Sequence, residues 1–315
     1  MRKFWLIVRQ AFTEFFNDHG LKFSASLSYY TVFSLGPVLL IIISLAGIFF
    51  GKDAVEGKIY AQINGLVGSA AALQIQDIIG NIEESQFTRS GAVIGFIILF
   101  IGATGVFTEM QDSINYIWSI KTKPRKGLVK LVFDRILSFS LIISFGFVLM
   151  VSLAVHALVD LLHDKIARYF DEVTVVVFQG LNYILLFVVI TTLFAIIFKL
   201  LPDAKVRWKD SYAGATFTAV LFLIGKFLIG FYLGNSNIGV TFGTAASLVI
   251  ILLWVYYTSI ILYFGAEFTR IYTMNFGGGI VPKKTAVLII KQESTELTPS
   301  RDDIAMMEEK QNGAK

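Results

Sequence analysis

The chain has 315 residues, of which 55% are hydrophobic and only 16% are charged, and its formal net charge is +4. A soluble globule of this length cannot bury so much apolar surface, so the composition excludes an ordinary soluble domain, and it excludes disorder for most of the chain. The absence of cysteine excludes disulfides, thiol nucleophiles and thiolate metal sites. The three histidines are scattered, so we expect no metal and no cofactor.

The N-terminal residues predict an amphipathic helix and not a cleavable signal peptide. Apolar residues recur there at helical spacing: Phe4, Val8, Ala11 and Phe15. Such a helix either lies in the membrane interface before the first span or docks on the helical bundle. We expect the interfacial position, and the docked position is the alternative.

Six apolar runs are long enough to cross a membrane, since a bilayer core of about 30 Å needs roughly 20 helical residues. The runs cover residues 26–50, 91–118, 136–159, 175–199, 211–233 and 244–267. They do not alternate apolar with polar residues, so membrane-spanning strands are not expected. The sequence therefore predicts an all-α membrane protein with one six-span domain over residues 1–275. Residues 276–315 form a polar, mostly disordered tail with one apolar island, Ala286–Ile290.

The distribution of Lys and Arg predicts the orientation of these spans. The two termini and the second and fourth loops together carry 21 of them, against five in the other three loops. Because cytoplasmic loops are enriched in Lys and Arg, both termini and the tail are predicted to be cytoplasmic.

The first span is unusually polar. Its small polar residues form two neighbouring stripes: Ser24, Ser28 and Thr31, then Tyr30 and Ser34. Pro37 removes a backbone donor and is expected to kink the helix. The stripes either allow close contact between helices or line a cavity that opens to the cytoplasm.

The second span carries glycines along one face, which permits close approach of a neighbouring helix. These glycines are Gly91, Gly95, Gly102 and Gly105. Glu109, Asp112 and Asn115 follow near the predicted cytoplasmic boundary. The acids either mark where the membrane ends or form a charged vestibule, with Lys22, Arg135 or Arg270 as partners.

Lys226 lies inside the fifth span, about eight residues or about 12 Å from its outer end. A lysine at mid-membrane is unfavourable, so we expect Lys226 to face the bundle or a wet cavity, with His156 and Asn182 among its candidate partners. There are two alternatives. Lys226 makes a purely structural polar contact between helices, or its side chain extends part of the way to the membrane surface. Glu267 and Arg270 are spaced i, i+3 at the cytoplasmic edge of the sixth span and can pair with each other.

Three stretches resemble the BrkB/YihY family of bacterial inner-membrane proteins. They are Ser24–Leu40, Thr108–Ile120 and Leu201–Arg270. The resemblance implies six spans with cytoplasmic ends in the bacterial inner membrane. An older label connects this family to ribonuclease BN, but the chain has no HxH motif and no cluster of aspartates.

We expect a non-enzymatic, multi-pass protein that transports or flips a hydrophobic or anionic envelope molecule, a lipid among the candidates. A non-catalytic membrane scaffold or envelope-assembly protein is the alternative. Membrane lipids are the expected partners, nucleic acid is not, and the oligomeric state stays open.

Overall fold

The computed structural model describes residues 2–34, 105–123, 172–235 and 246–291, together with the single residues 73 and 242. The predicted span 136–159 lies outside the described residues, as do most of the first span and half of the second. The same holds for Pro37, Gly91, Gly95, Gly102 and His156. Asn182 is placed by its backbone only.

Three long helices dominate the described chain: α7 (Glu172–Leu200), α8 (Trp208–Asn235) and α10 (Ala246–Asn275). They cover the predicted spans 175–199 and 211–233 and residues 246–267 of the predicted span 244–267. Each contains a stretch long and apolar enough to cross a membrane. α10 continues beyond the predicted end at residue 267 because Phe268 and Ile271 remain buried against α1 (Arg2–Asn17).

A seam of glycine and threonine brings α8 and α10 close together. A Cβ atom added at Gly214 would lie 1.9 Å from Thr269 Oγ1, and one added at Gly265 would lie 2.0 Å from Thr218 Oγ1. Each threonine hydroxyl donates to the glycine carbonyl one turn back in its own helix, at 2.8 Å for Thr218 and 2.6 Å for Thr269. The polar atoms of the seam are therefore paired within each helix, and the contact between the two helices rests on close packing.

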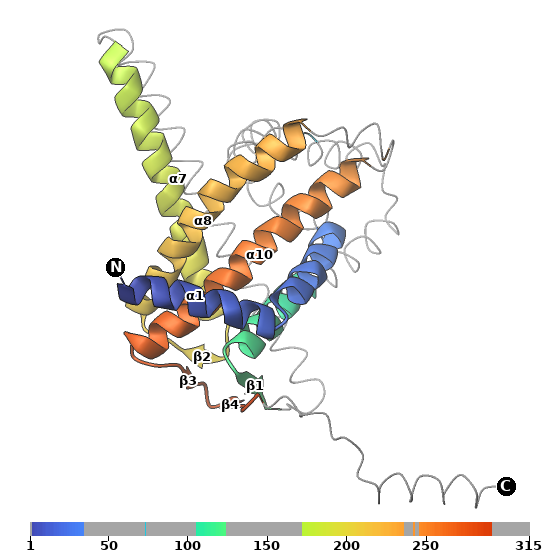
Figure 1. The fold of residues 1–315 in the computed structure, drawn as a ribbon, viewed down its shortest axis with the longest axis vertical. Coiled ribbons are helices and arrows are strands. Elements are labelled where there is room, and N and C mark those ends of the chain that lie inside the picture. The colour runs from blue at the N-terminus through green and yellow to red at the C-terminus, as the bar shows by residue number, and fades with distance from the viewer. Residues whose placement is uncertain are drawn as a thin grey trace, which may run out of the picture.

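The helix α1 lies across α8 and α10 (Figure 1). Ile7, Ala11 and Phe15 are buried on the side that faces the bundle. Other apolar side chains of the helix are exposed, among them Trp5 and Phe12. The helix thus docks on the bundle, as in the alternative from the sequence, while its outer side keeps the character of an interfacial helix.

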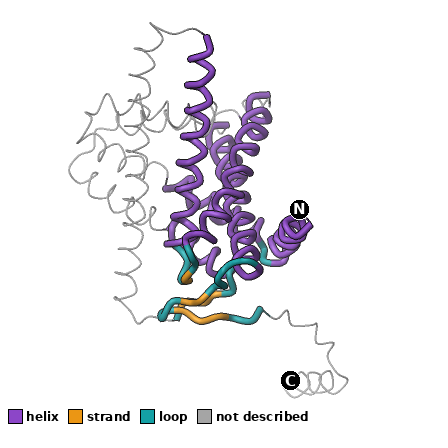
Figure 2. The backbone as a smooth tube through the Cα atoms, turned by 90° about the vertical axis from the view of Figure 1, so that its left-hand side faces the viewer, coloured by secondary structure: helices purple, strands orange, loops and turns teal. Residues whose placement is uncertain are grey.

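Four short strands lie at one end of the long helices, called here the basal end (Figure 2). The strand β1 (Ile120–Thr122) pairs antiparallel with β4 (Ala286–Leu288), and β2 (Ala204–Lys205) pairs antiparallel with β3 (Val281–Pro282). The described fold is therefore mostly helical and not purely so. The strands arise because residues 276–291 fold back and pair with the segments that follow helix 105–117 and α7.

Replacing Gly265 with alanine is expected to destabilise the protein by about 1–3 kcal/mol, because the new methyl group collides with Thr218. Unfolding by SDS in mixed micelles measures this change. Gly230→Ala is the control, since a Cβ at Gly230 meets no described atom within 4 Å. Equal stability of the two variants would contradict the close contact.

Candidate functional site

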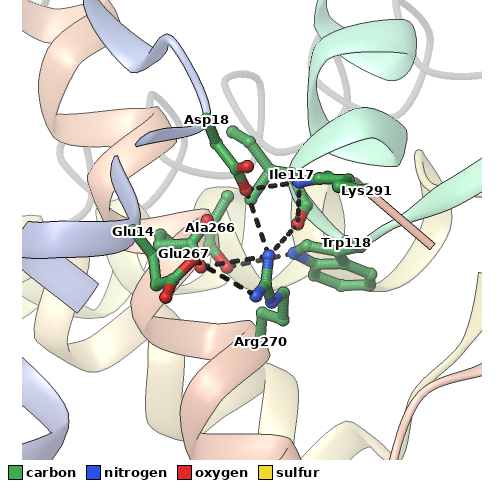
Figure 3. A network of polar contacts seen from close by, with 8 residues as sticks. All are labelled: Glu14, Asp18, Ile117, Trp118, Ala266, Glu267, Arg270 and Lys291. Atoms are coloured by element: carbon green, nitrogen blue, oxygen red, sulfur yellow. Dashed lines mark hydrogen bonds and ion pairs between the residues drawn. The ribbon is translucent and has the colours of Figure 1, made fainter. Parts of the chain in front are cut away.

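Arg270 on α10 is the centre of a buried polar group at the basal end (Figure 3). Its Nη1 atom donates to Asp18 Oδ2 at 3.1 Å and to the carbonyl oxygen of Ile117 at 2.5 Å. The same nitrogen lies 3.3 Å from Glu267 Oε1, and Nη2 lies 3.9 Å from Glu14 Oε2. These residues together with Lys291 are called the Arg270 cluster.

Lys291 brings the end of the described chain into this cluster. Its Nζ atom donates to Asp18 Oδ2 at 2.5 Å and to the Ile117 carbonyl at 3.4 Å, and it lies 4.4 Å from the centroid of the Tyr116 ring. Burial lowers the pKa of Lys291, and the hydrogen bond to Asp18 opposes that effect. Two cations therefore satisfy the terminal carbonyl of helix 105–117, where the helix dipole favours positive charge.

Trp118 fixes the end of helix 105–117 against α10. Its ring is buried, and its Nε1 atom donates to the carbonyl of Ala266 at 3.0 Å. Trp118 and Arg270 border a cavity of about 320 Å³, which is also lined by Gln10, Asn275 and Leu288. In the described part of the chain, no group of three His, Asp or Glu residues is arranged to hold a metal ion.

Glu267 is the most buried acid of the cluster, with 0% of its surface exposed. Its expected ion pair with Arg270 is present, but neither carboxylate oxygen makes a hydrogen bond to a described atom. The ion pairs that the structure shows for Arg270 go to Glu14, Asp18 and Glu267, and not to Glu109 or Asp112.

Asp203 forms a second polar group, which holds the α7–α8 connection on helix 105–117. Its Oδ2 atom accepts from Thr122 Oγ1 at 2.9 Å, from Asn115 Nδ2 at 3.3 Å and from Gln111 Nε2 at 3.5 Å. The backbone nitrogen of Asp203 donates to Asn115 Oδ1 at 2.8 Å. In the structure Asn115, a predicted lining residue, anchors this connection.

The hydroxyls of the first span bond within helix 20–34. They donate to carbonyls three or four residues back, from Ser24, Ser28, Thr31 and Ser34. Tyr30 is exposed at 41%, and its ring lies 3.1 Å from where a Cβ atom would be at Gly105. These contacts favour the packing interpretation of the stripe over the cavity interpretation.

The two predicted vestibule acids differ in exposure. Glu109 is half-buried, and its Oε1 atom accepts a hydrogen bond from Ser113 Oγ at 3.5 Å. Asp112 is exposed. The two carboxylates therefore do not share one environment.

Lys226 is half-buried on α8. It continues the face that carries the buried residues Ala219 and Phe222, at spacings of seven and four residues. The next residue, Phe227, belongs to the exposed face, as does Phe231. The ammonium group is thus carried on the protein-facing side of α8, within the stretch Trp208–Tyr232 that can cross a membrane.

Other polar atoms lie near the same level of the bundle. The Phe222 ring contacts the rings of Phe194 on α7 and Trp254 on α10, with centroids 6.0 and 6.2 Å apart. Trp254 Nε1 and Thr191 Oγ1 are buried without a hydrogen-bond partner among the described residues. Lys226 therefore lies one turn beyond a junction of three helices that carries unsatisfied polar atoms.

The family model for virulence factor BrkB matches residues 11–287 of this chain. The chain belongs to the BrkB family. It is 25% identical over 273 residues to a UPF0761 membrane protein of Verminephrobacter eiseniae, covering 84% of this chain and 62% of that protein. It is 27% identical to one of Vibrio vulnificus, covering 77% of this chain and 74% of that protein.

The chain spans about half to two thirds of the length of the first relatives that it matches, 56% in a UPF0761 membrane protein of Rhodospirillum centenum. No solved structure matches the chain. Together, the relatives and the three long apolar helices establish a membrane protein of the BrkB family.

Most partners in these contacts could not be predicted from the sequence. Asp18 and Lys291 lie 273 residues apart, and Asp203 lies 88 residues from Asn115. Spacing along one helix reveals the pair Glu267 and Arg270, but it carries no signal for partners on other segments. The available signal was the pair of acids in a largely apolar and basic N-terminal stretch, Glu14 and Asp18.

Replacing Arg270 with alanine is expected to destabilise the protein by about 3–5 kcal/mol, because it leaves Asp18 and the Ile117 carbonyl short of a buried donor. Arg9→Ala removes the same charge from an exposed position of α1 and is expected to change stability by less than about 0.5 kcal/mol. SDS unfolding of both variants measures the difference. A loss for Arg270→Ala as small as that for Arg9→Ala would show that the cluster is not structural.

Proposed function

We propose that the protein is a six-span inner-membrane transporter or flippase for a hydrophobic or anionic envelope molecule, with an anionic lipid as the first candidate. The observation that carries this proposal is the position of Lys226 on the protein-facing side of a helix long and apolar enough to cross a membrane. A cation within the membrane is rarely kept without a function, because its burial is unfavourable.

In this mechanism Lys226 attracts the anionic group of the transported molecule. A positive charge acts strongly in the low-dielectric interior of a membrane protein, so one ammonium group can offset part of the desolvation of a phosphate. Trp254 Nε1 and Thr191 Oγ1, which bond to no described atom, offer further hydrogen-bonding groups near this level. The apolar part of the molecule remains beside the apolar surface of the helices. No catalytic step is included.

The proposed orientation places the basal end and both termini in the cytoplasm. Arg270 and Lys291 are partly buried at this end, while the exposed cations include Lys121, Lys123, Lys205, Arg207 and Lys209. The acids Asp203 and Asp210 are buried there, so the accessible charge is positive. This distribution is the one expected for the cytoplasmic side of a membrane protein.

The scaffold alternative is favoured by a different observation. The α8–α10 seam is closely packed, and the hydroxyls of helix 20–34 bond within their own helix. Both features are those of helices that pack against one another without enclosing a transport pathway. A scaffold would show no movement of lipid in a purified system.

The direct experiment is lipid flipping in proteoliposomes, measured as quenching of fluorescent anionic or zwitterionic lipids from outside. The wild type is expected to accelerate flipping of the anionic lipid over protein-free vesicles, and Lys226→Ala to slow it at least about tenfold. Lys226→Arg keeps the charge and should retain most of the rate.

The matched control is Phe227→Ala, which alters the exposed face of the same turn and is expected to leave the rate unchanged. No acceleration by the wild type in either lipid would contradict the flippase and support the scaffold. An equal flipping rate for Lys226→Ala and the wild type would show that Lys226 has no role in flipping.

A further inference from the structure

Glu267 is surrounded by charged groups from four parts of the described chain (Figure 3). Glu14 faces it from α1, Asp18 from the turn after α1, Arg270 from the next turn of α10, and Lys291 from the C-terminal segment. Glu267 is completely buried, so solvent does not screen these charges.

The charges of the Arg270 cluster do not balance. Three carboxyl groups face two cations, Arg270 and Lys291. Asp18 receives hydrogen bonds from both cations, and the Glu14 side chain is 33% exposed and therefore hydrated. The surplus negative charge is most unfavourable on Glu267, which has neither hydrogen bonds from described atoms nor solvent.

A carboxyl group relieves such a surplus by taking up a proton. A neutral carboxylic acid without a hydrogen-bond partner is far less unfavourable in a buried site than an ion without one. Protonation of Glu267 leaves two carboxylates against two cations, so the cluster becomes neutral.

We propose that Glu267 is a proton-binding site, which holds a proton while the Arg270 cluster is closed and releases it when the cluster opens to water. Opening exposes the carboxyl group, and water then stabilises its ionised form. Because the closed state binds one more proton than the open state, a rise in pH favours opening of the basal end. This site would link proton concentration to the conformation of the protein, whatever molecule the protein moves.

Infrared spectroscopy of the full-length protein in detergent tests the proposal. The wild type at neutral pH is expected to show the C=O stretching band of a protonated carboxylic acid, and Glu267→Gln to lose it. Glu14→Gln alters the partly exposed acid of the same cluster and should retain the band. Absence of the band from the wild type at neutral pH, or its persistence in Glu267→Gln, overturns the proposal.

Thermal unfolding gives a second test that depends on the sign of the effect. The folded protein holds a proton that the unfolded chain has lost above acidic pH, so the wild-type melting temperature should fall as pH rises from mildly acidic values through neutrality, until Glu267 ionises in the folded protein as well. Glu267→Gln imitates the protonated acid, so it should fold at neutral pH and show a smaller fall. An equal fall in both proteins counts against the proposal. Both tests use protein without a transported molecule, so they succeed or fail separately from the proposed transport.

Discussion

A partly buried guanidinium joins segments that are far apart in the sequence. Arg270 bonds to the turn after α1 and to the end of helix 105–117, and Asp18 extends the contact to Lys291 near the end of the described chain. Polar groups removed from water must be paired within the protein. Displacing any of these segments would therefore leave a polar group of the cluster without its hydrogen-bond partner. The position of α1 across the bundle follows from this constraint together with the packing of Ile7 and Ala11.

Two other buried carboxylates at the basal end also join distant segments of the chain. Asp203 binds donors from helix 105–117 and β1, and Asp210 accepts from Arg207 and from the backbone of Gly278. Each buried carboxylate thus ties one connection or helix start to a distant part of the chain. Away from this end the described helices are held mainly by packing, and Lys226, Thr191 and Trp254 are among the polar residues there. In the proposed transporter, polar contacts join the chain segments at the basal end, and Lys226 meets the anionic group of the transported molecule among the apolar helices above it.

The long helices could be predicted from the sequence because a span needs only length and apolar composition, both of which are local. The pair Glu267 and Arg270 was predictable for the same reason, since one helical turn fixes their distance. The strands were missed because pairings of two or three residues are too short to show alternation. Asp18 and Lys291 were missed because their partners come from other segments. The glycines of the α8–α10 seam were missed because their threonine partners lie on the other helix.

A double-mutant cycle between Asp18 and Arg270 tests the central claim most directly, namely that their contact holds α1 to the bundle. The free energy of unfolding is measured for the wild type, Asp18→Asn, Arg270→Gln and the double variant in mixed micelles. The account predicts a coupling energy of about 1.5 kcal/mol or more, since the two groups meet at 3.1 Å in a buried site. Losses that add to within about 0.5 kcal/mol would contradict it and show that α1 is held by apolar packing alone.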